Sequence, residues 1–184
     1  MRELVDQARI RDVLRRLADA AVGSNGGRVF LTGGATAVLY GWRASTIDID
    51  LKFVPDHDRV LRAIPALKEA LHVNIELASP VDFIPVPEGW EDRGIFISEI
   101  GPLTFFHFDI YAQALAKLER GHAQDLADVR HMVATGLVER DRALAYFHRA
   151  EPELYRFPAI DARSYLRAVN AFFDGSASSS ESVK

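Results

Sequence analysis

Asp48 and Asp50 are the residues whose type and spacing point most directly to chemistry. They lie in the segment IDIDLKF, where apolar residues alternate with polar ones, and this period of two is typical of a half-buried strand. Both carboxylates therefore share one face, with Cα atoms about 6.5 to 7 Å apart. They repel each other, and a pair of Mg²⁺ ions roughly 3.5 to 4 Å apart would neutralise them while holding phosphates. The alternative is an edge strand that shows two solvated Asp residues to water.

Thr32-Gly33-Gly34 is a glycine turn between a predicted buried strand at 28–31 and a predicted helix at 35–40. A helix that begins directly after two glycines directs its free N–H groups and the positive end of its dipole at whatever lies above the strand. This arrangement suits a phosphate. The turn has neither the GxGxxG nor the GxxxxGK[ST] spacing, and a tight connection without a ligand would have the same sequence.

Taken together, the segment LTGGATAVLYGWRASTIDIDLKF resembles the core of the nucleotidyltransferase superfamily, which is built around a polymerase-β-like palm. It is most similar to the AbiEii-like toxin branch of type IV toxin–antitoxin and abortive-infection systems. Downstream, Lys117 and the run Asp125-Leu126-Ala127-Asp128 resemble a Lys and an Asp-x-x-Asp element of that branch. The likeness covers roughly residues 28 to 135.

The resemblance implies Mg²⁺-dependent transfer of a nucleoside monophosphate from a nucleoside triphosphate to an acceptor hydroxyl. Asp48 and Asp50 would hold Mg²⁺, and the glycine turn would cradle the β- and γ-phosphates. The residues expected to contact the nucleotide are Thr32, Gly33, Gly34, Arg43, Ser45 and Thr46. A polar helix-to-strand loop without a ligand would also carry the last three.

The resemblance also implies a third metal-binding carboxylate on a neighbouring strand, for which Asp82 and Glu76 are the candidates. We prefer Asp82, because Val81 and Phe83 give it the alternating setting of a strand, whereas Glu76 comes just before a Ser-Pro break. The alternative is that Asp82 caps a turn.

Lys117 and Asp125 complete the expected catalytic set. Lys117 lies in a predicted helix, from which it could reach the triphosphate as a point charge or extend to water. Asp125 and Asp128 are three residues apart, so they share a helix face. The resemblance places Asp125 in the active site, and Asp128 is expected to support it, bonded to Arg120 or Arg130. A carboxylate at Asp125 also suits the first turn of a helix without any catalytic role.

The implied acceptor is a tRNA 3′ end, the donor a pyrimidine triphosphate, and a further partner a cognate antitoxin. Two other functions fit the same motifs. One is transfer to a small molecule such as an antibiotic, and the other is a non-catalytic palm that serves as a nucleotide-binding interaction module.

Composition favours a cytoplasmic protein that forms one compact unit. The chain has 184 residues, 48% of them hydrophobic, a mean hydropathy of −0.03 and no cysteine, which excludes disulfides and thiol nucleophiles. The formal net charge of −4 argues against a general nucleic-acid binder, and the interspersed acids favour a solvated face for the arginines of the C-terminal third. No apolar run approaches the length of a membrane span. Among scattered histidines, His107 alternates with phenylalanines, and we interpret it as structural.

The order of the predicted elements favours an α+β fold, with a mixed sheet flanked by helices and followed by a C-terminal helical region. The resemblance implies that this sheet is a nucleotidyltransferase-like palm. The predicted helices are at about 2–21, 35–40, 57–71, 111–120, 123–134, 139–149 and 161–173, and the later strands at about 73–77, 81–84, 94–100 and 103–109. Residues 1–110 form the predicted palm, 111–173 the helical region, and 174–184 a Ser-rich tail expected to be disordered.

Overall fold

The computed structural model describes residues 3–177 of the chain. They pack as two compact units. The first unit runs to Ser79 and resumes at Glu91–Asp109, and the second contains Pro80–Trp90 and the chain from Ile110 onward. No described helix is both long enough and apolar enough to cross a membrane.

The first unit is built on a five-stranded mixed sheet in the order β3-β2-β1-β5-β4. The strands are β1 (Gly27–Thr32), β2 (Asp48–Val54), β3 (Asn74–Glu76), β4 (Ile95–Ile100) and β5 (Leu103–His107). β1 runs antiparallel to β2 and parallel to β5, β4 runs antiparallel to β5, and β2 runs parallel to β3. Parallel neighbours need a crossover connection, which α3 (Asp58–Leu71) provides between β2 and β3.

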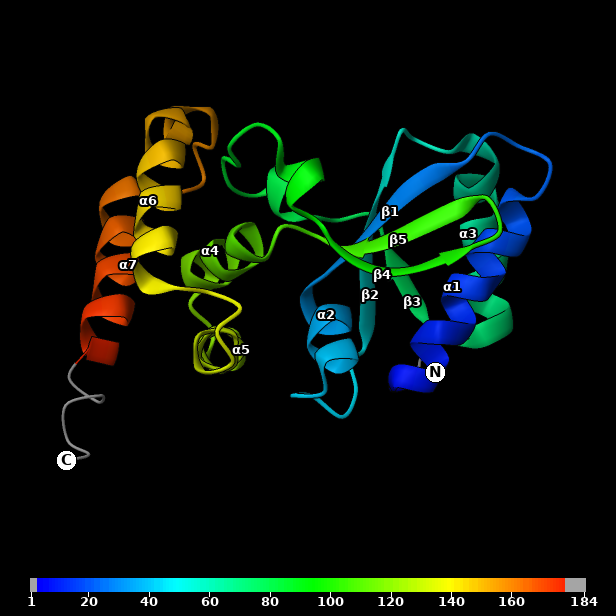
Figure 1. The fold of residues 1–184 in the computed structure, drawn as a ribbon, viewed down its shortest axis with the longest axis horizontal. Coiled ribbons are helices and arrows are strands. Elements are labelled where there is room, and N and C mark those ends of the chain that lie inside the picture. Colours follow the sequence, from blue (N-terminus) through cyan, green and yellow to red (C-terminus); the bar gives the residue numbers. More distant parts are fainter. Residues whose placement is uncertain (1–2, 178–184) are drawn as a thin grey trace. The chain divides into compact units, whose positions relative to one another are not determined.

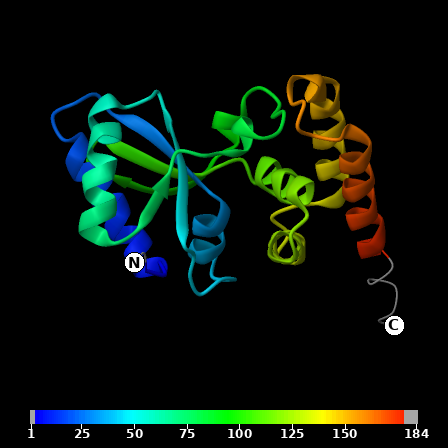
Figure 2. The ribbon, with the colours of Figure 1, turned by 180° about the vertical axis from the view of Figure 1, so that it is seen from behind.

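Helices α1 (Gln7–Ala21) and α3 pack beside each other over one face of this sheet (Figures 1 and 2). Alternate residues of β2 point to these helices, and Ile49, Leu51 and Phe53 are at most 3% exposed. The remaining positions of β2 therefore lie on the opposite face. α1 begins later than residue 2, because the Asp6 carboxylate caps it by accepting a hydrogen bond from the backbone N–H of Arg9 at 2.9 Å.

The second unit is helical. It contains α4 (Ile110–Arg120), α5 (Ala123–Ala134), α6 (Arg140–Ala150) and α7 (Ala162–Ala177), with the 3₁₀ helices η1 (Pro80–Asp82) and η3 (Glu151–Arg156). Tyr165 of α7 joins two of these helices, since its hydroxyl donates to the carbonyl of Leu115 in α4 at 3.1 Å and its ring packs edge-on against Phe147 of α6. Burial raises the pKa of Tyr165, so the hydroxyl stays protonated.

The predicted α+β class is confirmed, with a mixed sheet and helices followed by the C-terminal helices α4–α7. The predicted strand at 81–84 is wrong. Pro80 begins a 3₁₀ turn there, and its carbonyl accepts hydrogen bonds from the backbone N–H groups of Phe83 and Ile84. α7 also continues to Ala177, past its predicted end, and residues 178–184 of the predicted tail lie outside the described residues.

Candidate functional site

Asp48 and Asp50 lie on the face of β2 that points away from α1 and α3. Burial alternates along β2 as the sequence predicts, and both carboxylate residues are half-buried while Ile49 between them is fully buried. The two side chains therefore occupy one face of the sheet, close enough to act on the same ligand.

β3 adds two more polar side chains to this face. In the parallel register, Asn74 lies opposite Asp48 and Glu76 lies opposite Asp50. The Asn74 side chain is 2% exposed, and its Nδ2 donates hydrogen bonds to Asp48 Oδ1 at 2.7 Å and to Glu76 Oε1 at 2.5 Å. Three carboxylates and one amide thus form a two-by-two array on adjacent strands.

Gly33 brings the glycine turn against this array. Thr32 ends β1 opposite Asp50, and α2 (Gly33–Tyr40) begins at the next residue. Gly33 has a φ of +63°, and a Cβ at this position would lie 2.6 Å from Asp50 Oδ2, closer than real Cβ atoms come. Two features therefore require glycine at position 33: its left-handed backbone conformation and the Asp50 carboxylate that packs against it. The N-terminus of α2 and the Asp50 carboxylate meet at this point.

Gly34 packs closely against the loop between α2 and β2. A Cβ on Gly34 would lie 2.8 Å from the Cβ of Thr46 and 3.6 Å from Nη1 of Arg43. Thr46 is buried, and its hydroxyl donates to the backbone carbonyl of Asp48 at 3.1 Å. The half-buried Ser45 lies in the same loop. The first unit therefore brings the two predicted motifs and the loop between them together, with the guanidinium of Arg43 near the start of α2.

The donors on this face suit a hard divalent cation. Across residues 3–177 there is no group of three or more His, Cys, Asp or Glu side chains that could hold a metal ion by itself. Mg²⁺ does not need such a group, because it is commonly held by one or two carboxylates, by substrate phosphates and by water. Asp48 and Asp50 supply two carboxylates next to a helix N-terminus, and this set fits a metal that is completed by a bound phosphate.

In the second unit, Lys117 sits in a buried charge cluster. Its Nζ donates to Asp125 at 3.1 Å and to Asp128 at 2.6 Å, and its side chain is 3% exposed. Arg120 also pairs with Asp125, at 2.7 Å. Lys117 therefore does not extend to water, which was one of its two expected placements. Asp128 contributes to this cluster by accepting the hydrogen bond from Lys117.

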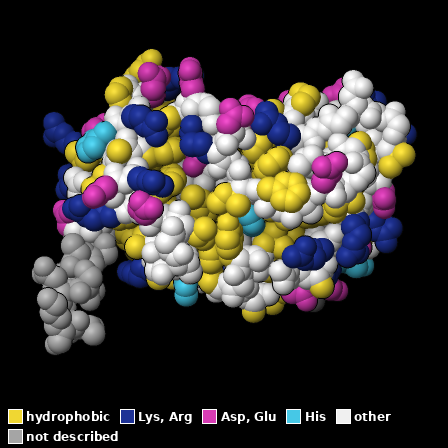
Figure 3. Space-filling model, in the orientation of Figure 1, with side chains coloured by type: hydrophobic (Ala, Val, Ile, Leu, Met, Phe, Trp, Pro, Cys, Tyr) yellow, Lys and Arg dark blue, Asp and Glu magenta, His cyan; other side chains and the backbone are white. Residues whose placement is uncertain are grey.

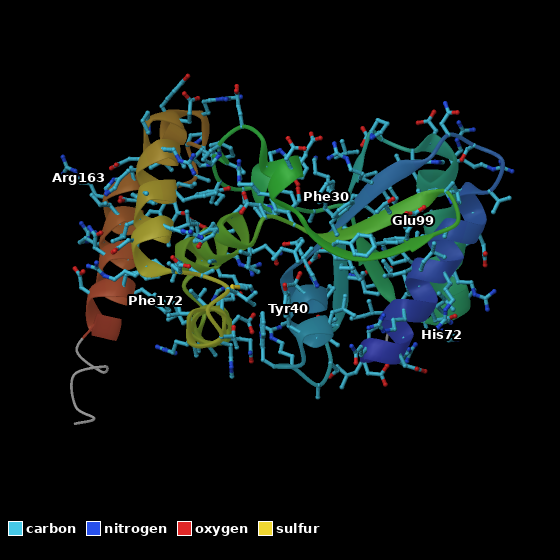
Figure 4. All side chains as sticks on the ribbon, in the orientation of Figure 1. Phe30, Tyr40, His72, Glu99, Arg163 and Phe172 are labelled. Carbon is cyan, nitrogen blue, oxygen red and sulfur yellow. The ribbon has the colours of Figure 1, made fainter. Side chains whose placement is uncertain are left out.

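His107 is buried near the start of α2. Its Nδ1 lies 3.1 Å from the hydroxyl of Thr36, and its ring centroid is 4.6 Å from that of Tyr40, which is labelled in Figure 4. Burial lowers the pKa of His107 to about 4, so the imidazole is neutral near pH 7. Asp109, two residues on, pairs with Arg93 at 2.6 Å.

Comparison with known protein families places the chain in one of them. A family model described as a nucleotidyltransferase of unknown function (DUF6036) matches residues 8–174. The chain belongs to this family. No curated protein and no solved structure matches it.

Membership of DUF6036 supports the resemblance to nucleotidyltransferases that the sequence shows. The chain is thus a nucleotidyltransferase by family, and a nucleoside triphosphate is the substrate that the family description implies. The match makes no link to AbiEii toxins, so the toxin branch, the tRNA acceptor and the antitoxin stay predictions.

The structure changes the argument for the third carboxylate of this DUF6036 protein. The preference for Asp82 depends on a predicted strand beside β2, but Asp82 lies in η1 and belongs to the second unit. Glu76 occupies the strand that does lie beside β2, in register with Asp50. Pairing between β2 and β3 was not visible in the sequence, because it depends on the crossover through α3.

Asn74 is the site residue that the sequence reasoning missed. A weak signal was present, since Asn74 and Glu76 flank Ile75 in a short alternating segment and so must share a face. The signal becomes informative only once β3 is known to be the neighbour of β2.

The arginines of the C-terminal region are mixed with acidic residues on the face shown in Figure 3. On this face, Arg side chains over α6 and α7 are interspersed with Asp and Glu. Several are ion-paired, including Arg140 with Asp141 and Asp174, and Arg142 with Glu139. This pattern agrees with the predicted solvated face.

Proposed function

We propose that this protein transfers a nucleoside monophosphate from a nucleoside triphosphate to an acceptor hydroxyl, with Mg²⁺ as cofactor. The observation that carries the proposal is the packing of Gly33 against the Asp50 carboxylate. It supports the proposal because it sets a phosphate-attracting helix N-terminus next to a cation-attracting carboxylate pair.

The triphosphate would lie over the start of α2. The first backbone N–H groups of a helix have no partner within the helix, and the dipole there favours negative charge. The Arg43 guanidinium, near Gly34, adds a full positive charge and can contact two phosphate oxygens at once. Thr32, Ser45 and Thr46 would shape this end of the site, as the sequence predicted.

Asp48 and Asp50 would hold Mg²⁺, and we place the third carboxylate at Glu76 in preference to Asp82. When bound, the metal would neutralise negative charge on the phosphates and help to activate the attacking hydroxyl. The protein's own contribution is positioning. The β2 face orients the carboxylates, and the glycine turn admits the phosphates close to the backbone.

In the transfer step, the acceptor oxygen bonds to the α-phosphorus in line with the leaving group. The bond from the α-phosphorus to its bridging oxygen breaks, pyrophosphate leaves, and the hydroxyl proton passes to solvent. The catalytic roles that the resemblance implies for Lys117 and Asp125 stay predictions. From the same resemblance, we propose a tRNA 3′ end as acceptor and a pyrimidine triphosphate as donor.

The test is to incubate purified protein with each α-labelled nucleoside triphosphate, Mg²⁺ and either total tRNA or an antibiotic as acceptor, with and without EDTA. We expect Mg²⁺-dependent label on an acceptor, and loss of that label by orders of magnitude in Asp50→Asn. Asp58→Asn is the matched control, because Asp58 is 83% exposed on α3 and should leave transfer unchanged. Label on a small molecule would contradict the tRNA acceptor, and no transfer with any acceptor would contradict the enzyme.

A further inference from the structure

Asn74 has a hydrogen-bonding pattern that its burial makes unusual. Both hydrogen bonds of its side chain run from Nδ2, to Asp48 Oδ1 and to Glu76 Oε1. Its Oδ1 is buried and has no partner, and among the described residues it is the only such buried side-chain nitrogen or oxygen. Turning the amide over would point Oδ1 at two carboxylate oxygens, which repel it, so the carboxylates determine the orientation.

An unpaired buried carbonyl destabilises a fold. The backbone pairing of β2 with β3 does not require it, because any residue except proline could make the same ladder hydrogen bonds at position 74. The unpaired amide carbonyl of Asn74 therefore destabilises the fold locally, and it lies beside the candidate catalytic carboxylates. Residues that lower local stability are expected at functional sites, where function determines the choice of side chain.

We infer that Asn74 is a positioning residue, which holds the Asp48 and Glu76 carboxylates in the orientation that receives the metal. This inference rests on the proposed function. Asn74 Nδ2 donates a hydrogen bond to Oδ1 of Asp48, so Oδ2 of the same carboxylate can bind a cation. A neutral donor restrains the carboxylates without cancelling their charge, whereas a Lys or Arg here would replace the cation that the site attracts.

A positioning role and a structural role predict different results for Asn74→Leu, a variant of similar shape. Leu removes the unpaired carbonyl, while Asp48 and Glu76 can hydrate because they are half-buried and exposed. We therefore expect the urea midpoint in EDTA to stay the same or rise. We expect the Mg²⁺ concentration for half-maximal transfer to rise about 10- to 100-fold, the range typical of groups that orient metal ligands. A structural role would instead lower the urea midpoint and leave the Mg²⁺ requirement unchanged.

The experiment measures transfer against Mg²⁺ concentration, and urea unfolding with and without Mg²⁺, for the full chain. Asn74→Ser is the second variant, because it also removes the unpaired carbonyl and its small side chain should fold if Leu does not. Ile75→Val is the matched control on the same strand. Ile75 is 2% exposed and faces the core, so this change should lower the urea midpoint without altering the Mg²⁺ requirement.

The outcomes separate the two proposals. Active wild-type protein whose Asn74 variants keep the wild-type Mg²⁺ requirement would overturn the positioning role alone. Variants that lose stability and activity together would show that Asn74 has a structural role. This result would also overturn the positioning role. A wild-type protein that neither transfers label nor gains stability from Mg²⁺ would overturn the proposed function and the inference with it.

Discussion

Replacing Gly33 with Ala tests whether the contact between the glycine turn and Asp50 matters for catalysis. At a φ of +63°, Ala is strained by about 1–2 kcal/mol from its backbone alone. Its Cβ would also lie 2.6 Å from Asp50 Oδ2, where ordinary contacts begin near 3.4 Å, so the carboxylate or the turn must move by about 0.8 Å. Overpacking of this kind adds about 1–3 kcal/mol. A displacement near 1 Å at a reacting centre lowers the rate about 100-fold.

Gly101→Ala is the matched control. Gly101 has a φ of +53°, but a Cβ there would meet no atom within 4 Å. It therefore carries the backbone strain without the clash. Urea unfolding and transfer at saturating Mg²⁺ would be measured for both variants. We expect Gly101→Ala to lose about 1–2 kcal/mol of unfolding free energy and to keep its activity.

Folded Gly33→Ala that transfers label as fast as Gly101→Ala would refute a catalytic role for the contact between Gly33 and Asp50. That result would mean that Asp50 tolerates displacement, and so does not hold the metal in the way proposed. A second contrary result is an equal loss of stability in the two variants, which would show that the clash is relieved without strain.

Three further predictions concern charge. Arg43→Met should raise the KM for the triphosphate about 10-fold with a smaller effect on kcat, in steady-state kinetics, if the guanidinium binds phosphate; an unchanged KM argues against this. Lys117→Met should lower the unfolding free energy by about 3–5 kcal/mol in urea melts. The variant removes the cation beside the buried carboxylate of Asp128 and leaves Asp125 with Arg120; a loss below about 1 kcal/mol contradicts this. His107 has its pKa lowered to about 4 in the fold, against about 6.5 when unfolded, so the unfolded state binds more protons between these values. Stability should therefore fall by about 3 kcal/mol from pH 6.5 to pH 4, and His107→Gln should flatten this dependence, which unfolding at several pH values would check.

Local patterns in the sequence were enough to predict the two motifs and their elements. The alternation around Asp48 and Asp50 reflects the period of a strand, and consecutive glycines permit a backbone that other residues resist. Both properties depend on a few neighbouring residues. The helices α4–α7 were predicted for the same reason. Most of their predicted ends lie within a few residues of the ends in the structure.

The segment around Asp82 shows where local patterns mislead. Val81 and Phe83 alternate with Asp82 as they would in a strand, but Pro80 and the following residues close a 3₁₀ turn by hydrogen bonds to one carbonyl. A pattern of three residues does not distinguish these conformations.

The sequence by itself determined that a carboxylate pair on a strand follows a glycine turn into a helix, because these features arise from backbone conformation and residue period. Only the tertiary structure decided which side chains lie beside that pair. Asn74 and Glu76 reach it through the parallel pairing of β3 with β2, and Gly33 reaches Asp50 through the antiparallel pairing of β1 with β2. Strand pairing joins residues far apart in the chain, so its outcome depends on how the whole sheet and its covering helices pack.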